Sequence, residues 1–139
     1  MKRCVLCAIN AKYIHSNLAV LDLRSYAGQV PGFTVVIAEY TINHQRDQIV
    51  AELVAQKPDL LVFSCYIWNI TMVREIGEIL HLILPDTVIL LGGPEVSFDC
   101  GRQLTTYPFA KAIVKGEGER AFREILENWP ELETVDGLL

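Results

Sequence analysis

Four short stretches of the chain contain most of the side chains that could bind a ligand or do chemistry. They are residues 10–16, 64–69, 92–97 and 115–119. Their aromatic and ionisable groups include Tyr13, His15, Tyr66, Trp68, Glu95, Glu117 and Glu119. Flat aromatic rings suit a planar ligand, whereas imidazole and carboxylate groups can transfer protons. The four stretches predict a ligand site if the fold brings them together.

The stretch at 92–97 is the most unusual of the four. An apolar run at 88–91 stops at Gly92 and Gly93, and Pro94 follows. Paired glycines leave the backbone bare, so a ligand can approach the main chain without meeting a Cβ atom. A tight turn from a strand into a helix explains the same residues equally well. On the ligand interpretation, Gly93→Val would fill the slot and abolish binding while the fold stays intact.

The metal-ligating residue types do not form a convincing metal site. His15 stands alone in its loop, where a surface or helix-start hydrogen bond is the simplest role, with ligand contact and metal binding as alternatives. Cys4 and Cys7 have CxxC spacing, but on the expected strand positions i and i+3 point to opposite faces. We expect free thiols, no metal ligand and no catalytic residue in this chain.

Composition excludes several classes of protein. The 139 residues suffice for one domain with a core, and a hydrophobic content of 51% excludes global disorder. The net charge of −5 argues against a nucleic-acid partner. No apolar run approaches the roughly 20 residues of a membrane span. The basic start at Lys2 resembles a signal peptide, but Asn10 and Lys12 interrupt the apolar stretch early. We therefore expect a cytoplasmic domain without a membrane partner.

Common nucleotide-binding signatures are missing from the sequence. There is no GxxxxGK[ST] P-loop, and no GxGxxG follows the first expected strand. Gly116 to Glu119 reads Gly-Glu-Gly-Glu, but its two carboxylates would repel a phosphate and more simply favour a helix N-terminus. A phosphoacceptor receiver domain would need acidic residues where this chain has Asn10 and Ser64.

Apolar runs and helix-spaced apolar stripes alternate five times along the chain. The expected strands are residues 4–9, 33–38, 60–63, 88–91 and 112–114. The expected helices cover residues 18–23, 49–54, 70–84, 99–107 and 121–129. Each repeat is about 25–30 residues long, as in βαβ units. We predict an α/β domain with a five-stranded parallel sheet between two helical layers, in the flavodoxin-like order 2-1-3-4-5.

That strand order decides where a ligand would bind. In open α/β sheets the site lies at the carboxyl ends of the strands, at the point where the order reverses. Here this point lies between the first and third strands, so the loops at 10–16, 64–69 and 92–97 meet there. Tyr66 and Trp68 either divide between the core and a helix end or form a flat wall for a planar ligand.

The same loops resemble the N-terminal cobalamin-binding domain of cobalamin-dependent radical SAM proteins. This family includes methyltransferases and relatives of the anaerobic Mg-protoporphyrin monomethyl ester cyclase. The resemblance covers essentially the whole chain and rests on four motifs in register, which read NAKYIHS from Asn10, SCYIWN from Ser64, GGPEVS from Gly92 and GEGE from Gly116. It implies that Ser64 and the paired glycines line a slot for the nucleotide tail of cobalamin, between the first and third strands.

The resemblance also implies how the cobalt is treated. Many family members have a DxHxxG loop whose histidine binds cobalt, but His15 has no Asp two residues before it and no Gly three after it. The resemblance thus implies base-off cobalamin without a histidine ligand. The implied cofactor contacts are Asn10, Tyr13, His15, Ser16, Ser64, Tyr66, Trp68, Gly92, Gly93, Pro94, Glu95, Gly116 and Glu117.

The implied organisation extends beyond this chain. Residues 1–130 would form the cobalamin-binding domain, and residues 131–139 would begin a linker to a C-terminal radical SAM domain. That partner domain would hold S-adenosylmethionine and a [4Fe-4S] cluster and act on a small-molecule substrate, while the present chain alone would catalyse nothing. Two alternatives stay open: a degenerate scaffold domain that binds no corrin, and a flavin- or nucleotide-binding module.

Overall fold

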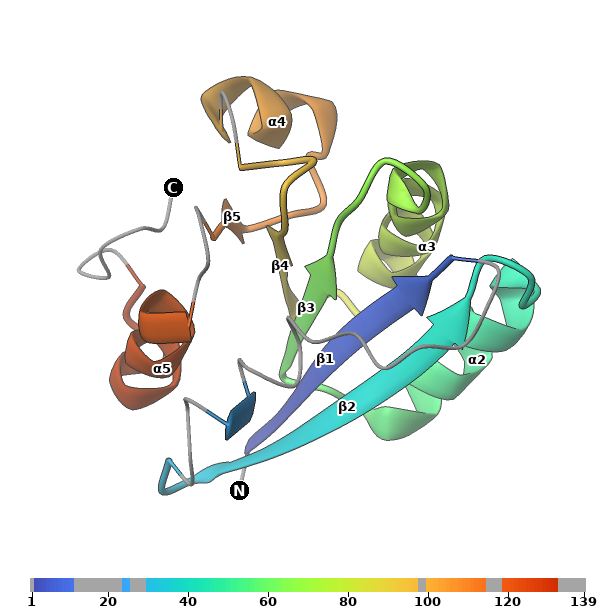
Figure 1. Ribbon diagram of the computed structural model, residues 1–139. Helices are drawn as coiled ribbons and strands as arrows, with labels where there is room; N and C mark the ends of the chain where they lie inside the picture. The colour runs from blue at the N-terminus through green and yellow to red at the C-terminus, as the bar shows by residue number, and fades with distance from the viewer. Residues whose placement is uncertain (1, 12–23, 26–29, 98–99, 115–118, 133–139) are drawn as a thin grey trace.

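The fold is one parallel sheet between two layers of helices (Figure 1). The computed structural model describes residues 2–11, 24–25, 30–97, 100–114 and 119–132. Five parallel strands form the sheet in the order β2-β1-β3-β4-β5, which confirms the predicted topology. The strands are β1 (Lys2–Asn10), β2 (Phe33–Thr41), β3 (Leu60–Ser64), β4 (Val88–Gly92) and β5 (Ala112–Ile113).

The helices cover both faces of this sheet, so the flavodoxin-like fold class is confirmed. They are α2 (Arg46–Gln56), α3 (Ile70–Ile83), α4 (Cys100–Thr106) and α5 (Glu119–Asn128). Helices α2 and α3 pack on one face of the sheet and α5 on the other; in Figure 1, α2 and α3 lie at the right and α5 at the left. The helix expected over 18–23 and the tail 133–139 fall outside the described residues. In the described ranges, no helix has the length and apolar character needed to cross a membrane.

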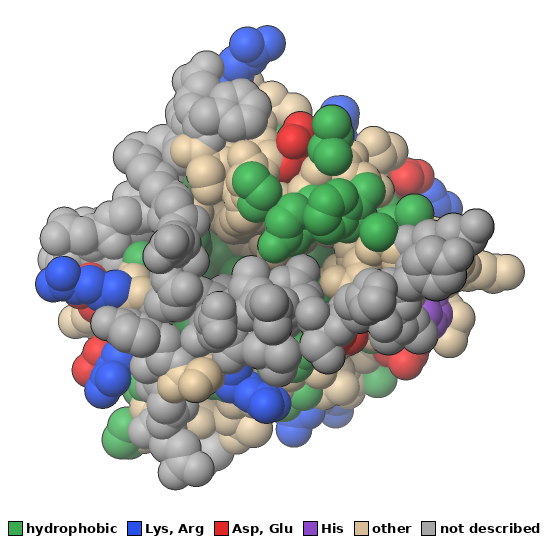
Figure 2. Space-filling view, in the orientation of Figure 1, with side chains coloured by type: hydrophobic (Ala, Val, Ile, Leu, Met, Phe, Trp, Pro, Cys, Tyr) green, Lys and Arg blue, Asp and Glu red, His purple; other side chains and the backbone are tan. Residues whose placement is uncertain are grey.

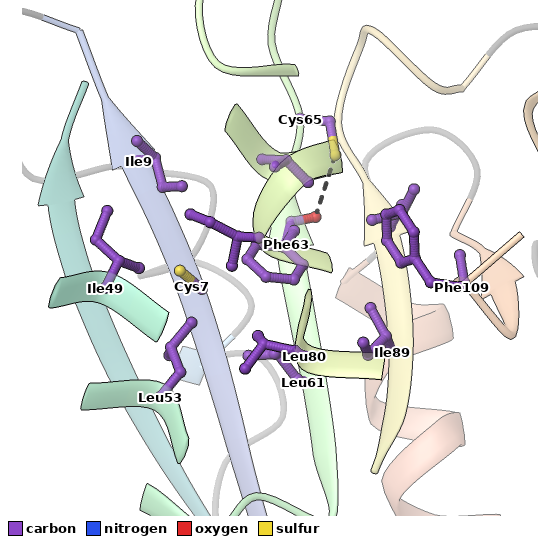
Figure 3. Packing of buried hydrophobic residues seen from close by; sticks show 14 of the residues in the cluster. Cys7, Ile9, Ile49, Leu53, Leu61, Phe63, Cys65, Leu80, Ile89 and Phe109 are labelled. Atoms are coloured by element: carbon purple, nitrogen blue, oxygen red, sulfur yellow. Dashed lines mark hydrogen bonds between the residues drawn. The ribbon is translucent and has the colours of Figure 1, made fainter. Parts of the chain in front are cut away.

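Strand β1 shows how the two faces of the sheet are separated. Cys7 and Ile9 pack toward α2 and α3, among the side chains drawn in Figure 3. Cys4 and Ala8 pack on the other face, with the apolar stripe of α5. The prediction that the CxxC cysteines point to opposite faces is confirmed. Burial raises the pKa of both thiols above its ordinary value, so they stay protonated and unreactive near neutral pH.

Helix α3 packs closely against the segment that precedes β5. Gly77 is buried in the middle of α3, and a Cβ atom there would overlap the ring of Phe109. The ring is itself buried and belongs to the cluster between the sheet and α3 (Figure 3). Glycine is the poorest helix former after proline, so its place inside α3 is explained by this close contact.

Candidate functional site

A row of small residues crosses the carboxyl edge of the sheet. Ala8 of β1 lies opposite Ser64 of β3, and Ser64 lies opposite Gly92 of β4. Paired residues of parallel strands project to the same face, and this face is the one that α5 covers. The three positions therefore form a shallow band across three adjacent strands, at the switch point where the strand order reverses.

The surroundings of this row are apolar, and Ala8 and Ser64 are themselves buried. Two residues earlier on the same face, Leu6, Val62 and Leu90 are buried in the α5-side cluster. Gly92 remains partly accessible. A Cβ atom added to Gly92 would make ordinary contacts with Val114, at 3.7 Å from its Cβ atom and 3.8 Å from its carbonyl oxygen. The row therefore has an apolar floor and lacks bulky side chains of its own.

Gly93 has a different role from Gly92, which corrects the expectation for Gly93→Val. Gly93 has a φ of +99°, and a Cβ atom there would lie 2.5 Å from the carbonyl oxygen of Cys65 and 2.7 Å from its nitrogen. The turn after β4 wraps around Cys65, whose amide donates to the Gly92 carbonyl at 2.7 Å. A side chain at Gly93 would thus strike the backbone after β3 and disturb the fold, instead of entering a slot.

Tyr66 and Trp68 form a stacked pair of rings at the end of β3. Their ring centroids are 4.4 Å apart and the ring planes differ by 6°. Trp68 is 46% exposed, and its indole Nε1 donates to the Ile9 carbonyl at 3.3 Å. In Figure 2, hydrophobic side chains gather in the upper part of the face, over the segment that links β3 to α3. The stacked rings thus lie at the carboxyl end of β3 and are joined through Trp68 to the end of β1.

Asn69 ties this loop to the ends of two strands. Its side chain is 1% exposed, and its Nδ2 donates to the carbonyls of Ile9 at 3.0 Å and Ser64 at 2.9 Å. Its Oδ1 accepts a hydrogen bond from the Tyr66 amide at 2.8 Å. The loop that carries the two rings is therefore joined to both strands that flank the switch point.

Asn10 and Glu39 form the polar end of the same face. Glu39 of β2 lies opposite Ala8, so it continues the row by one strand. Asn10 Nδ2 donates to Glu39 Oε2 at 3.3 Å, and Asn10 is buried. The predicted contact Asn10 is therefore at the carboxyl edge, but its amide is turned toward β2.

Pro94 and Glu95 lie on the turn after β4. Pro94 is exposed, and Glu95 is partly buried. The pKa of the Cys65 thiol is raised to about 12, first by burial and also by the charge of Glu95, while a hydrogen bond with the Gly92 backbone lowers it. Burial and the charges of Cys65 and Glu95 raise the pKa of Tyr107. These electrostatic neighbours of Glu95 pack on the α3 side of the sheet.

The remaining predicted contacts lie outside the described residues. They are Tyr13, His15, Ser16, Gly116 and Glu117. Among the side chains that the structure does describe, no three or more His, Cys, Asp and Glu residues come close enough to hold a metal ion. The described part of the site thus consists of the small-residue row, the ring pair and the polar groups that hold them.

Two residues of this edge were missed from the sequence. Ala8 sits inside a continuous apolar strand, where its small size gives no signal until the register with Ser64 is known. The sequence places Asn69 at the end of a loop before a helix and gives no sign of its hydrogen bonds. The spacing of Ala8 from Asn10, two positions along one strand, could have placed both on one face.

The fold and this edge define a class of protein. In open α/β sheets, ligands bind outside the carboxyl ends of the strands at the switch point, where this chain has its row of small residues. The chain matches the family model of the B12 binding domain over residues 5–126, and it belongs to that family.

Two curated relatives are larger enzymes. The chain is 34% identical over 108 residues to 2-(S-pantetheinyl)-carbapenam-3-carboxylate methyltransferase of Streptantibioticus cattleyicolor, covering 75% of this chain and 15% of that enzyme. It is 34% identical over 70 residues to the cobalamin-dependent radical SAM methyltransferase TokK of Streptomyces tokunonensis, covering 50% of this chain and 10% of that enzyme. The chain thus spans a small fraction of either relative.

Two solved structures share the fold. The cobalamin-dependent S-adenosylmethionine radical enzyme OxsB superposes with a TM-score of 0.77 at 21% identity, over 99% of this chain and 20% of that one. A cobalamin-binding protein from Desulfitobacterium hafniense superposes with a TM-score of 0.67 at 16% identity, over 94% of this chain and 59% of that one. Both likenesses support the flavodoxin-like architecture.

Proposed function

We propose that this domain binds cobalamin, with the nucleotide tail lying in a slot along the row Ala8, Ser64 and Gly92. The single observation that carries the proposal is that these small residues stand side by side on one face, across three strands at the switch point. The tail ends in a flat, largely apolar benzimidazole. An apolar floor without projecting side chains suits such a group, because burying its faces removes apolar surface from water.

Individual groups of the site suit parts of cobalamin. Gly92 offers backbone without a Cβ atom, and the hydroxyl of Ser64 can donate or accept one hydrogen bond. Tyr66 and Trp68 would face the corrin ring or its amide arms, since their flat, stacked rings follow Ser64 closely at the carboxyl end of β3. Tyr13, His15, Ser16, Gly116 and Glu117 remain predicted contacts from the loops that border the site.

We propose that cobalamin binds base-off and without a protein imidazole on cobalt. The support is the sequence around His15, which lacks both the Asp and the Gly of the DxHxxG pattern. Withdrawal of the tail into the slot would leave the lower face of cobalt open or bound to water. When bound, cobalamin supplies a cobalt centre that can carry a methyl group or take part in radical chemistry.

We further propose that the domain is part of a radical SAM enzyme whose other domain holds S-adenosylmethionine and a [4Fe-4S] cluster. The support is that both curated relatives are much longer methyltransferases, of which this chain covers 15% and 10%. The present chain would hold and orient the corrin while the partner domain binds the small-molecule substrate. Cys4, Cys7 and Cys65 are free and buried, which agrees with a reducing, cytoplasmic compartment.

The test is retention of corrin by the purified chain. The chain is mixed with hydroxocobalamin, desalted, and examined by its visible absorption spectrum, which distinguishes base-off from base-on corrin. The proposal predicts a retained base-off spectrum for the wild-type chain. Gly92→Val should lose it, because the added side chain lies in the slot. Val88→Ile, which enlarges a residue at the opposite end of the same strand and on the same face, is the matched control.

The other outcomes identify the rival functions. Loss of all corrin on desalting, with a native far-UV circular dichroism spectrum, would favour a scaffold domain. A yellow protein as purified would favour a flavin. Equal retention by wild type and Gly92→Val would place the tail elsewhere and contradict the assignment of the slot.

A further inference from the structure

We propose that Asn69 is a positioning residue, which holds the Tyr66–Trp68 ring pair in place for the flat face of the ligand. The proposal rests on the proposed function, in which a corrin lies against these rings. Asn69 does not touch the ligand itself on this account. It acts through the loop that carries the two rings.

Three hydrogen bonds fix the Asn69 amide. Its Nδ2 bridges the carbonyls of Ile9 and Ser64, and its Oδ1 accepts from the Tyr66 amide. The side chain is 1% exposed, so water does not substitute for these partners. A buried amide with three good hydrogen bonds has one orientation, and so does the loop bonded to it.

Helix capping does not account for the Asn69 side chain. It occupies the N-cap position of α3, where asparagine is among the preferred residues, yet it makes no side-chain hydrogen bond to cap the helix. Its side chain turns instead to the strand ends and the loop. Stabilising the start of α3 therefore does not explain this residue, whereas holding the loop does.

Asn69 and Trp68 share one hydrogen-bond acceptor on β1. The Ile9 carbonyl accepts from Asn69 Nδ2 at 3.0 Å and from the Trp68 indole Nε1 at 3.3 Å. The amide and the ring are thus fixed to the same point at the end of β1. Fixing the rings before the ligand arrives lowers the entropy lost on binding, which is the effect expected of a positioning residue.

The test uses Asn69→Ser, because serine is also a preferred N-cap residue but is too short to bridge both carbonyls. All chains carry Trp129→Phe, so that Trp68 is the only tryptophan. We expect the unliganded Asn69→Ser chain to show a red-shifted Trp68 emission and a changed near-UV circular dichroism spectrum. Loss of the bridging hydrogen bonds predicts about tenfold weaker hydroxocobalamin binding.

Two controls separate positioning from general destabilisation. Val73→Ala removes a buried side chain from the same helix, so it lowers stability while leaving the Asn69 hydrogen bonds intact. It should leave the Trp68 emission and the hydroxocobalamin affinity at their wild-type values. In a Trp68→Ala background, Asn69→Ser should cause little further loss of affinity, since the group through which it acts is gone.

The contradicting results are specific. An unchanged Trp68 emission in Asn69→Ser, or a full further loss of affinity in the Trp68→Ala background, would overturn the proposal. So would failure of both Asn69→Ser and Asn69→Asp to fold, because Asn69 would then be required by the fold itself. If the wild-type chain binds no cobalamin, the proposed function fails, and the Trp68 emission alone decides the role of Asn69.

Discussion

Gly92 and Gly93 are adjacent, but alanine should lower the stability of the chain at Gly93 and not at Gly92. At Gly93 the backbone has a φ of +99°, and a Cβ atom would lie 2.5 Å from the Cys65 oxygen and 2.7 Å from its nitrogen. At Gly92 the nearest atom to a Cβ would be the Val114 Cβ atom, at an ordinary 3.7 Å. The first position is closed by backbone, whereas the second has room for a Cβ atom.

The magnitudes follow from these contacts. Left-handed backbone costs a non-glycine residue roughly 1–2 kcal/mol, and overpacking costs roughly 1–3 kcal/mol, so Gly93→Ala should lower the free energy of unfolding by about 2–5 kcal/mol. An unfolding entropy of about 2.1 cal/mol/K per residue over 139 residues converts this to a fall in Tm of about 7–17 °C. Gly92→Ala should be neutral or stabilise by up to about 1 kcal/mol, because alanine restricts the unfolded chain.

The assay is thermal and urea unfolding followed by far-UV circular dichroism, with both variants in parallel. Hydroxocobalamin retention is then measured on each folded chain. We expect Gly92→Ala to fold like wild type and to bind cobalamin more weakly. A Gly93→Ala chain whose Tm stays within about 2 °C of wild type would refute the reasoning from the Cys65 contact.

Three further predictions concern the rest of the molecule. Gly77→Ala should destabilise the chain by about 1 kcal/mol in urea unfolding, since the clash with the Phe109 ring exceeds the gain in helix propensity. Phe109→Leu in the same chain should recover part of this loss, and a Gly77→Ala chain more stable than wild type would contradict the contact. Burial raises the pKa of Cys65 from 9.0 to about 12. The contribution of the protonated Cys65 thiol to folding stability is therefore complete below pH 9 and is lost as pH rises toward 12. The urea midpoint should therefore fall above pH 9, and less steeply in Cys65→Ala; a midpoint independent of pH would oppose this. Trp68→Phe should weaken hydroxocobalamin binding less than Trp68→Ala, because it keeps a ring against Tyr66 and loses only the hydrogen bond to Ile9; equal losses would argue against stacking.

The fold could be predicted because its signals are local. Continuous apolar runs such as 60–63, which end at polar or glycine residues, identify buried parallel strands. The stripe that begins at Ile70 identifies α3 in the same way, and the observed helix runs from Ile70 to Ile83. Alternation along β1 was enough to separate Cys4 from Cys7.

The details of the site depend on contacts between strands, which the sequence alone does not reveal. The role of Gly93 depends on its positive φ and on Cys65, a residue 28 positions away. The role of Ala8 depends on its register with Ser64, and the role of Asn69 depends on its hydrogen bond to the Ile9 carbonyl of β1. The residue types predict which edge of the sheet would bind a ligand. Only the strand register and the loop contacts show that Gly92 can accept a Cβ atom and Gly93 cannot.

The central claim is that the row Ala8, Ser64 and Gly92 receives the nucleotide tail, and isothermal titration tests it most directly. The wild-type chain and Gly92→Val are each titrated with hydroxocobalamin and with dicyanocobinamide, a corrin that lacks the tail. We predict that the wild-type chain binds hydroxocobalamin more tightly than dicyanocobinamide, and that Gly92→Val loses this preference while still binding dicyanocobinamide. Equal affinity of the wild-type chain for both corrins, or a preference that Gly92→Val leaves unchanged, would contradict the claim.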